Sequence, residues 1–407
     1  MISHRDRIPG CLANPSGREA LKVVGARDCT LFGASGREYL DLTSGWNVAN
    51  LGWANDAISR RVKAQLDSLA LAPNWCLHEP GIQLATDLCA CFDQSMAMLR
   101  ACTGTQAIEF ALRIARRATG RYAIVSVAEC YHGSTLGSLA ASGIEYLKKE
   151  DQPLEAWHRD LPIDAPVSVI RQKILTPPLP AAVLVEPLFT NPGAIDAGRE
   201  YYEAIVGAAG ECGSLIIVDE IGTGLGRLGH MFGFERFGMR PDIVTLGKSL
   251  GGGIMPISAV LMQERLVDAA RGLAFDSTFA GTPAACAAAS ATVDILKHSD
   301  LLQRARVLGD RFLERVRRNL ATCTGVREVR GTGLLFGIET EKSGRAEQAR
   351  FARAIEANLL DAGVFAASSR YTNSLLIMPP LTISEAKLMW CADLLPEIFY
   401  NSDRVHG

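Results

Sequence analysis

Residues 215–253, LIIVDEIGTGLGRLGHMFGFERFGMRPDIVTLGKSLGGG, decide the fold. The stretch begins with the apolar run Leu215–Val218, which Asp219 follows directly. It ends with a second apolar run, Ile243–Leu246, which is followed after one glycine by Lys248. Short apolar runs bounded by glycine and charged residues are typical of strands that are buried on both faces. Side chains that follow parallel strands meet at one edge of a sheet, where α/β proteins bind ligands. Asp219 and Lys248 are therefore candidate site residues.

Apolar runs of the same kind recur on both sides of this stretch. The predicted strands are Thr30–Phe32, Tyr39–Leu42, Tyr122–Val127, Ala182–Val185, Leu215–Val218, Ile243–Leu246 and Ile257–Met262. Beyond them the pattern predicts an amphipathic helix over residues 299–321, strands at Val326–Val329 and Leu334–Glu339, a helix near 346–361 and a strand at Leu375–Met378. Strands that alternate with helices indicate crossover connections, and hence a mainly parallel sheet with helices on both faces.

The length of the chain and a change of pattern near residue 295 predict more than one domain. A chain of 407 residues is long for a single domain. We predict an α/β fold with a large domain over residues 46–295, which contains the mainly parallel central sheet. A smaller α+β domain is predicted over residues 296–407, and an N-terminal arm over residues 1–45 is expected to join it.

Composition narrows the classes of partner. The formal net charge is −2 and no block of Lys or Arg occurs, which argues against nucleic acid and membrane surfaces. No apolar run approaches the length of a membrane span. The eleven cysteines stand at irregular positions without a CxxC pair, so we expect reduced thiols and no metal site. The sequence predicts a cytoplasmic protein that acts on small molecules.

Two further features are candidates for the same site. Glu186 follows the strand Ala182–Val185 in the way that Asp219 follows its own strand. Gly104 and Thr105 begin a predicted helix, and free N–H groups at the start of a helix suit a phosphate. Taken alone, each feature is more typical of an ordinary helix cap.

An aromatic residue completes the set. Tyr131 and His132 follow the strand Tyr122–Val127. A tyrosine at the end of a strand can stack on a planar ring, although a single aromatic residue is more often part of the core.

A nucleotide-binding loop is a rival interpretation of Lys248, because Gly-Lys-Ser also ends a P-loop. That loop requires a glycine five residues before Gly247, and Asp242 stands there. A lysine amine, a carboxylate, a phosphate cup and a stacking ring are instead what pyridoxal 5′-phosphate (PLP) needs, since the cofactor has an aldehyde, a pyridine nitrogen, a phosphate and a flat ring. We therefore expect a PLP enzyme.

The sequence also resembles a known family, the class III (subgroup II) PLP-dependent aminotransferases of fold type I. The resemblance extends over nearly the whole chain and is most specific over residues 218–261. It implies an aminotransferase that works as a homodimer with shared active sites. Amino groups would pass in a ping-pong mechanism from an amine or amino acid to a 2-oxo acid, aldehyde or ketone, and ω-amino donors are one possibility.

The resemblance also implies a role for each site residue. Lys248 would form the Schiff base with PLP and, with Asp219, carry the catalysis, Asp219 being the partner of the ring nitrogen. The residues implied in cofactor binding are Gly104, Thr105, Tyr131, His132, Glu186, Asp219, Ile221, Lys248 and Thr278. Thr278 would reach the phosphate held by the neighbouring subunit.

Some positions depart from the pattern of the family. Gly222 stands where many members have Gln or another side chain near the phenolic oxygen of the cofactor, and Thr282 stands where Asn is common. Leu376 occupies the place where acetylornithine-type members keep an arginine for the substrate α-carboxylate. Trp46 and Arg370 match, at slightly shifted spacing, a pocket tryptophan and a mobile carboxylate-binding arginine of members that use ω-amino donors. They are the predicted substrate-binding residues.

Other chemistry on the same scaffold stays open at this stage. Aminomutases, epimerases, decarboxylases and ammonia-lyases share the fold and its lysine, and Glu186-Pro187 followed by Asn191-Pro192-Gly193 leans towards the aminomutase branch. A non-catalytic relative that serves as a binding subunit is a further alternative, although Lys248, Asp219 and Tyr131 are all intact.

Overall fold

The computed structural model describes residues 21–148, 157–275, 277–342, 344–369, 372 and 374–404. Its centre is a sheet of seven described strands in the order β4-β10-β9-β8-β7-β5-β6. Their bounds are β4 Met96–Ala101, β10 Ser258–Gln263, β9 Ile243–Leu246, β8 Leu215–Asp219, β7 Ala182–Val185, β5 Ile124–Val127 and β6 His158–Leu161. Neighbours from β9 to β6 pair in parallel, whereas β10 is antiparallel to both β9 and β4. The predicted α/β fold with a mainly parallel sheet is confirmed.

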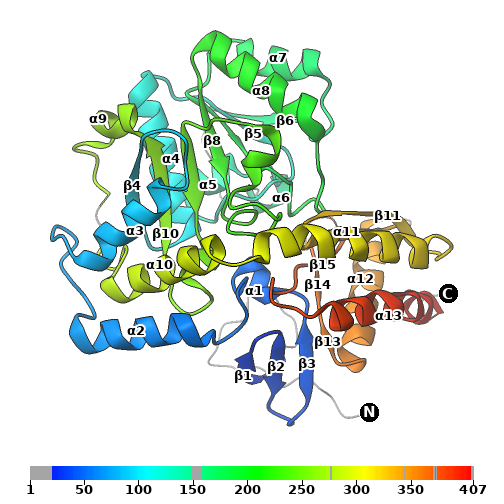
Figure 1. Ribbon diagram of the computed structural model, residues 1–407. Coiled ribbons are helices and arrows are strands. Elements are labelled where there is room, and N and C mark those ends of the chain that lie inside the picture. Colours follow the sequence, from blue (N-terminus) through cyan, green and yellow to red (C-terminus); the bar gives the residue numbers. More distant parts are fainter. Residues whose placement is uncertain are drawn as a thin grey trace.

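Helices cover both faces of this sheet (Figure 1). They are α2 Asp56–Ser68, α3 Glu79–Cys89, α4 Gly104–Thr119, α5 Leu136–Ala141, α6 Glu145–Lys148, α7 Val167–Leu175, α8 Gly198–Cys212, α9 Val267–Ala270 and α10 Pro283–Lys297. Alternate residues of one strand serve opposite faces: in β8, Leu215 and Ile217 pack in the cluster of α4, whereas Ile216 and Val218 pack in the cluster of α8. Burial on both sides explains why these strands are continuous apolar runs in the sequence.

Two smaller sheets lie on the other side of α10 and of the turn α1, Ser44–Asn47. One has the order β1-β2-β3-β13 and the other β11-β12-β15-β14. Their strands are β1 Val23–Arg27, β2 Thr30–Gly33, β3 Glu38–Asp41, β11 Val326–Thr332, β12 Leu335–Thr340, β13 Val364–Phe365, β14 Ala367–Ser368 and β15 Leu375–Ile377. Because β3 pairs with β13, the start of the chain joins its last third. The exact domain boundaries stay a prediction.

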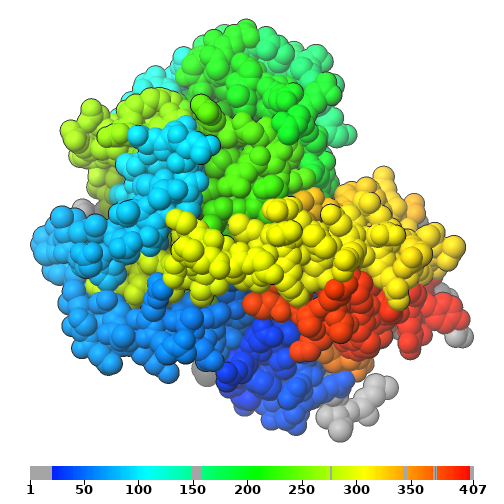
Figure 2. Space-filling view, in the orientation of Figure 1, coloured from blue at the N-terminus to red at the C-terminus, as the bar shows by residue number. Residues whose placement is uncertain are grey.

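Three long helices accompany the smaller sheets: α11 Leu301–Leu320, α12 Arg345–Asp361 and α13 Glu385–Arg404. Figure 2 shows α11 and α13, in yellow and red, side by side below the large sheet region. Among the described residues, no helix is both long and apolar enough to cross a membrane.

The differences from the predicted elements are small and have local causes. β4 was not predicted, because its sequence MAMLRA is rich in residues that favour helices. β6, with the sequence HRDL, was also not predicted, since only Leu161 is buried and apolar. Strand β5 begins at Ile124, two residues later than predicted.

Candidate active site

Lys248 stands where β9 ends and the short helix η2, Lys248–Gly251, begins. Its φ of 43° is left-handed, a conformation that costs energy for a residue with a side chain and is common at functional sites. The preceding Gly247 cannot be replaced without movement, because a Cβ there would lie 2.7 Å from Ser258 Oγ. The chain therefore turns sharply at the strand end, and it presents the lysine side chain at the carboxyl edge of the sheet.

Asp219 is the last residue of β8, next to β9, and is buried. Its Oδ2 accepts a hydrogen bond from His132 Nδ1 at 2.7 Å. Its Oδ1 accepts one from the backbone N–H of Ile221 at 3.0 Å and one from Thr245 Oγ1 at 3.2 Å. A carboxylate offers about four acceptor positions. Asp219 is therefore fixed in orientation and keeps an acceptor position for a further donor.

His132 and Thr245 hold Asp219 from opposite sides. The ring of His132 is buried, and Ser142 Oγ accepts the hydrogen bond of its backbone N–H at 2.8 Å. His132 is also a predicted cofactor-binding residue; in the structure its Nδ1 contacts Asp219, and its contact with the cofactor stays a prediction. Thr245 was not predicted as a site residue, although it is the only polar residue in the run IVTL of β9. A hydroxyl in the middle of a buried strand is the signal that could have identified it.

The lysine lies in acidic surroundings. Burial lowers the pKa of Lys248, and the charges of Asp219 and Glu186 partly oppose this shift. Glu186, buried after β7, accepts a hydrogen bond from the backbone N–H of Thr190 at 3.2 Å. Burial raises the pKa of Glu186, while the nearby His132 lowers it. The structure thus brings three predicted ionisable residues to one edge, where the amine is held closer to its neutral form than in water.

Gly104, Ile221 and Gly247 lie close together where the sheet edge meets the start of α4. A Cβ on Gly104 would lie 3.0 Å from Ile221 Cδ1, and a Cβ on Gly247 would lie 3.5 Å from Ile221 Cγ2 and 3.6 Å from Gly104 Cα. The side chain of Ile221 therefore forms an apolar wall that lies against both glycines. The first-turn N–H groups of α4 have no partners within the helix.

The loop between β5 and α5 is tied to α4. Thr105 Oγ1 accepts a hydrogen bond from the backbone N–H of Ser134 at 2.8 Å and lies 2.8 Å from Ser138 Oγ. Glu109 Oε1 accepts the N–H of Ser138 at 2.9 Å. The hydroxyl of Thr105 is thus engaged within the protein, whereas its backbone N–H, in the first turn of α4, has no partner within the helix. Tyr131 is half-buried in this loop.

Of the other predicted residues, Trp46 is half-buried and packs against the apolar cluster that contains Leu188, Leu376 and Met378. Thr278 is exposed on the single chain and is not among the contacts of Lys248 described above. Arg370 lies outside the described residues.

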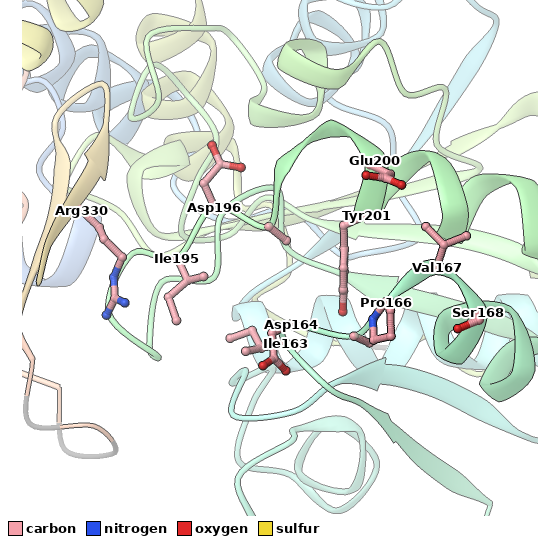
Figure 3. Close-up of a pocket in the computed structure, with 12 residues that line it drawn as sticks. Ile163, Asp164, Pro166, Val167, Ser168, Ile195, Asp196, Glu200, Tyr201 and Arg330 are labelled. Atoms are coloured by element: carbon pink, nitrogen blue, oxygen red, sulfur yellow. The ribbon is translucent and has the colours of Figure 1, made fainter.

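Figure 3 shows a different surface hollow, of about 760 Å³, between the segment after β6, helix α8 and Arg330. Arg330 is paired there with Glu328 and Glu339 at 2.8 Å and 2.6 Å. None of the residues that surround Lys248 lines it. The hollow is separate from the candidate active site.

The residues at the sheet edge fit PLP. The amine of Lys248 suits the aldehyde, and the open acceptor position of Asp219 suits the ring N–H. The N–H groups of α4 suit the phosphate, and the wall formed by Ile221 suits one face of the ring. Asn47 adds a further sign of a ligand, since both its amide atoms are buried without a hydrogen-bond partner among the described residues.

Comparison with known proteins gives a consistent result. The model of the class III aminotransferase family matches residues 12–399. The acetylornithine aminotransferase of Archaeoglobus fulgidus is 30% identical over 91% of this chain and 93% of that protein. The putrescine aminotransferase of Pectobacterium atrosepticum is 32% identical over 90% of this chain and 79% of that protein. The crystal structure of an amine transaminase from an uncultivated Pseudomonas species, in its PLP-bound form, has a TM-score of 0.88 and 25% identity, and the match covers 98% of this chain and 100% of that one.

Proposed function

The chain belongs to the class III aminotransferase family, and from this premise we propose which residues carry the amino transfer and which substrates it uses. The predicted family, the aminotransferase activity and the dependence on PLP are confirmed. The alternative chemistry of mutases, epimerases and lyases is not favoured, since the relatives are named as aminotransferases and transaminases.

One observation carries the proposed mechanism: the amine of Lys248 lies beside two buried carboxyl groups, one of which is fixed in place by three hydrogen bonds. When bound, PLP supplies a carbonyl that condenses with amines and a protonated ring that withdraws electrons from the substrate carbon. We propose Lys248 Nζ as the atom that bonds to this carbonyl. The burial that lowers its pKa favours the nucleophilic neutral amine.

Lys248 has a second proposed task after the substrate amine has displaced it. Its free Nζ would then take up the proton that the substrate carbon loses and later give a proton back. A base for this step needs a pKa near the working pH. The opposing effects of burial and of Asp219 and Glu186 on the pKa of Lys248 suit a group that must both accept and release a proton.

Asp219 is proposed to hold the proton on the ring nitrogen. Because the N–H of Ile221, Thr245 Oγ1 and His132 all hold the carboxylate, it needs little reorganisation when charge develops on the ring. Gly104 and the N–H of Thr105 would bind the phosphate, and Tyr131 and Ile221 would enclose the ring.

For the substrate, we propose an amine at the end of a carbon chain as the donor. The names of two relatives contain acetylornithine and putrescine, molecules that both have a terminal amine. In this chain Leu376 is fully buried in β15, and Trp46 packs against the apolar cluster that contains it. The described residues around Trp46 are therefore apolar. Arg370 is the proposed binder of the acceptor's carboxylate.

A half-reaction screen tests the donor class. The PLP form is mixed with terminal amines, α-amino acids and secondary-carbon amines, without an acceptor, and conversion to the pyridoxamine form is followed by absorbance. Conversion by terminal amines at rates at least ten times those of α-amino acids supports the proposal. Faster conversion by α-amino acids would overturn the donor class and leave the aminotransferase assignment intact.

Homodimerisation with shared sites is also proposed. The strongly exposed apolar side chains of the described residues include Trp75 (85%), Leu77 (87%) and Phe279 (63%). Arg100 joins their two segments, since it donates hydrogen bonds to the carbonyls of Asn74 and Gly281. An apolar patch of this kind indicates an interface. A cytoplasmic location stays a prediction from the sequence.

Mixing inactive subunits tests the shared site. Lys248→Ala and Thr278→Ala subunits, each impaired alone, should recover one intact site per mixed dimer if Thr278 serves the neighbouring subunit. Formation of mixed dimers without recovered activity would show that Thr278 acts in its own subunit or has no role.

A further inference from the structure

The carboxamide of Asn47 is buried and has nothing to bind within the described part of the chain. The residue is 1% exposed, and neither Oδ1 nor Nδ2 has a hydrogen-bond partner there. Buried amides are almost always paired, because an unpaired buried donor or acceptor loses its bonds to water without replacement. Two open atoms on one side chain indicate a group that the protein binds but does not itself contain.

The backbone around Asn47 is held in an uncommon conformation. Ser44, Gly45, Trp46 and Asn47 all have left-handed φ values, of 49°, 63°, 68° and 65°. A run of such residues is costly unless its surroundings impose it, and it is found preferentially at functional sites. The turn is anchored at its first residue, since Ser44 Oγ donates to the carbonyl of Met378 at 2.6 Å. The turn fixes the direction of the Asn47 side chain.

That direction leads to the reacting amine. A Cβ on Gly222 would lie 4.0 Å from Asn47 Nδ2, 3.5 Å from Lys248 Nζ and 3.4 Å from Thr190 Oγ1. Gly222 has no side chain, so the space between the amide and the lysine is left open. The carboxamide and the lysine amine therefore border one small space at the sheet edge.

We propose that Asn47 is a cofactor-contacting residue whose side-chain N–H donates a hydrogen bond to the phenolic oxygen of PLP. In this cofactor the phenolic oxygen stands on the ring carbon next to the one that bears the aldehyde. With the aldehyde carbon bonded to Lys248 Nζ, that oxygen would lie close to Nζ, next to the space that the amide of Asn47 borders. The inference rests on the proposed attachment of PLP to Lys248, and it gives a function to a side chain that the sequence analysis passed over.

The proposed bond changes the proton affinity of Lys248 Nζ in the cofactor-bound protein. The negative charge of the phenolic oxygen helps to hold a proton on Nζ, and an N–H donor draws on that same charge. Among the described residues, the charges of Asp219 and Glu186 act on Nζ, and the titratable ring of His132 contacts Asp219. Loss of the Asn47 donor, with these three unchanged, should raise the pH at which Nζ loses its proton.

The test uses two variants that tolerate a left-handed backbone. Asn47→Gly removes the amide, and Asn47→Asp replaces the donor by an acceptor of nearly the same shape. In Asn47→Gly we expect the midpoint of the pH titration of the visible cofactor band to rise by roughly 0.5 to 1 unit, and PLP to dissociate with a roughly three- to tenfold higher Kd. Asn47→Asp should raise the midpoint further, because it places a negative charge near Nζ.

Gly222→Gln offers a rescue from the opposite side of the same space. Gly222 has no left-handed φ, and a Cβ there meets its neighbours at ordinary contact distances, so a side chain is tolerated. Combined with Asn47→Gly, it supplies an amide that can reach the space left by Asn47, and we expect the midpoint and the Kd to return towards the original values. Asn358→Ala, which removes a distant bond to Ser402, is the matched control and should change neither.

The outcomes separate this inference from the proposed function. An unchanged Kd and midpoint in Asn47→Gly would overturn it, and so would a change in KM for one substrate alone, which would assign the amide to that substrate. A change in midpoint and Kd that Gly222→Gln does not reverse would mean that Asn47 only supports the local structure. Borohydride reduction of the same samples, followed by peptide mass analysis, checks the premise, since a cofactor found on another lysine would remove both proposals.

Discussion

The sheet edge with Asp219 and Lys248 and the turn Ser44–Asn47 border the same space. They differ in how far the protein itself provides hydrogen-bond partners for their polar side chains. At the edge, Asp219 accepts three hydrogen bonds from the protein before any ligand binds. In the turn, neither amide atom of Asn47 has a hydrogen-bond partner among the described residues. The protein itself fixes the carboxylate of Asp219, whereas it leaves the amide of Asn47 for what the site binds.

This difference separates two kinds of task. A carboxylate that must hold a ring proton through the whole reaction works best when its position is fixed beforehand, because reorganisation would add to the barrier. A group that distinguishes one bound molecule from another gains most from an unmet hydrogen bond, because a molecule that lacks the matching atom leaves it unpaired. We therefore expect substitutions at the edge to lower the rate with every substrate, and loss of the Asn47 amide to change the binding and titration of the cofactor but not the KM for one substrate alone.

Lys248→Ala is the most severe way to test the edge. Turnover should fall by roughly 10⁴-fold or more with every donor, because both the covalent attachment and the proton transfer are lost. PLP should still bind through the start of α4, without the band of the covalent form. Absorbance spectra and single-turnover rates measure both effects. A variant that turns over one donor at near-normal rate would show that another base serves the site.

Asp219→Asn should have the next largest effect, a loss of roughly 10³-fold in the half-reaction rate. The side chain is nearly isosteric, so the fold is retained. An amide cannot stabilise the ring proton, however, and in neither orientation can it accept from both His132 Nδ1 and the N–H of Ile221. Stopped-flow spectra with two unlike donors give the rates. Equal losses would support the comparison, whereas a loss confined to one donor would contradict it.

Glu220 tests whether the stability of the fold depends on a protonated carboxyl group at the same edge. Burial raises its pKa to about 7, and its oxygens accept hydrogen bonds from Thr223 Oγ1 and the N–H of Phe234. The pKa of Glu220 is higher in the folded protein than in the unfolded chain. The protonated carboxyl group therefore contributes its full stabilisation of the fold below about pH 4.5, and this contribution is lost as the pH rises through 7.

Glu220→Gln removes this dependence. The free energy of unfolding of the variant, minus that of the unsubstituted protein, should rise by roughly 3 kcal/mol as the pH increases from 4.5 to 7.5. Urea denaturation at four pH values measures the difference, and Glu314→Gln, at an exposed position of α11, is the control. Parallel pH profiles for all three proteins would mean that Glu220 is ionised at neutral pH.

The sequence predicted the edge well and the turn poorly, and the reason is physical. Asp219, Glu186 and Lys248 each follow a buried apolar strand, so periodicity alone locates them at one edge. Asn47 follows Trp46 in a segment without periodicity, and its importance depends on a left-handed turn and on the missing side chain of Gly222. Contacts between such distant segments are decided by tertiary packing, which a local pattern does not contain.

Glu109 shows that a local pattern can also suggest a contact that tertiary packing replaces. The spacing of Glu109 and Arg113 resembles a helical ion pair, but Glu109 accepts hydrogen bonds from Thr135 and Ser138, while Arg113 donates to the carbonyl of Ala274. An exposed pair of this kind is worth only a few tenths of a kcal/mol, about 0.3–0.5. Bonds to the backbone of a neighbouring loop easily outweigh it.

Arg370→Ala is the smallest expected effect and the most selective one. Ping-pong transfer passes two different molecules through one pocket, and a donor without an α-carboxylate must not meet a fixed positive charge. The sequence predicts a loop at Arg370, from which an arginine can withdraw, whereas one at Leu376 inside the strand could not, and Leu376 is fully buried. A charge-assisted contact is worth roughly 1.5–3 kcal/mol. KM for the carboxylate-bearing substrate should therefore rise about ten- to a hundredfold, while the rate with a simple terminal amine stays within about twofold. Equal changes for both substrates, or none for either, would remove Arg370 from the site and require another group to bind the acid.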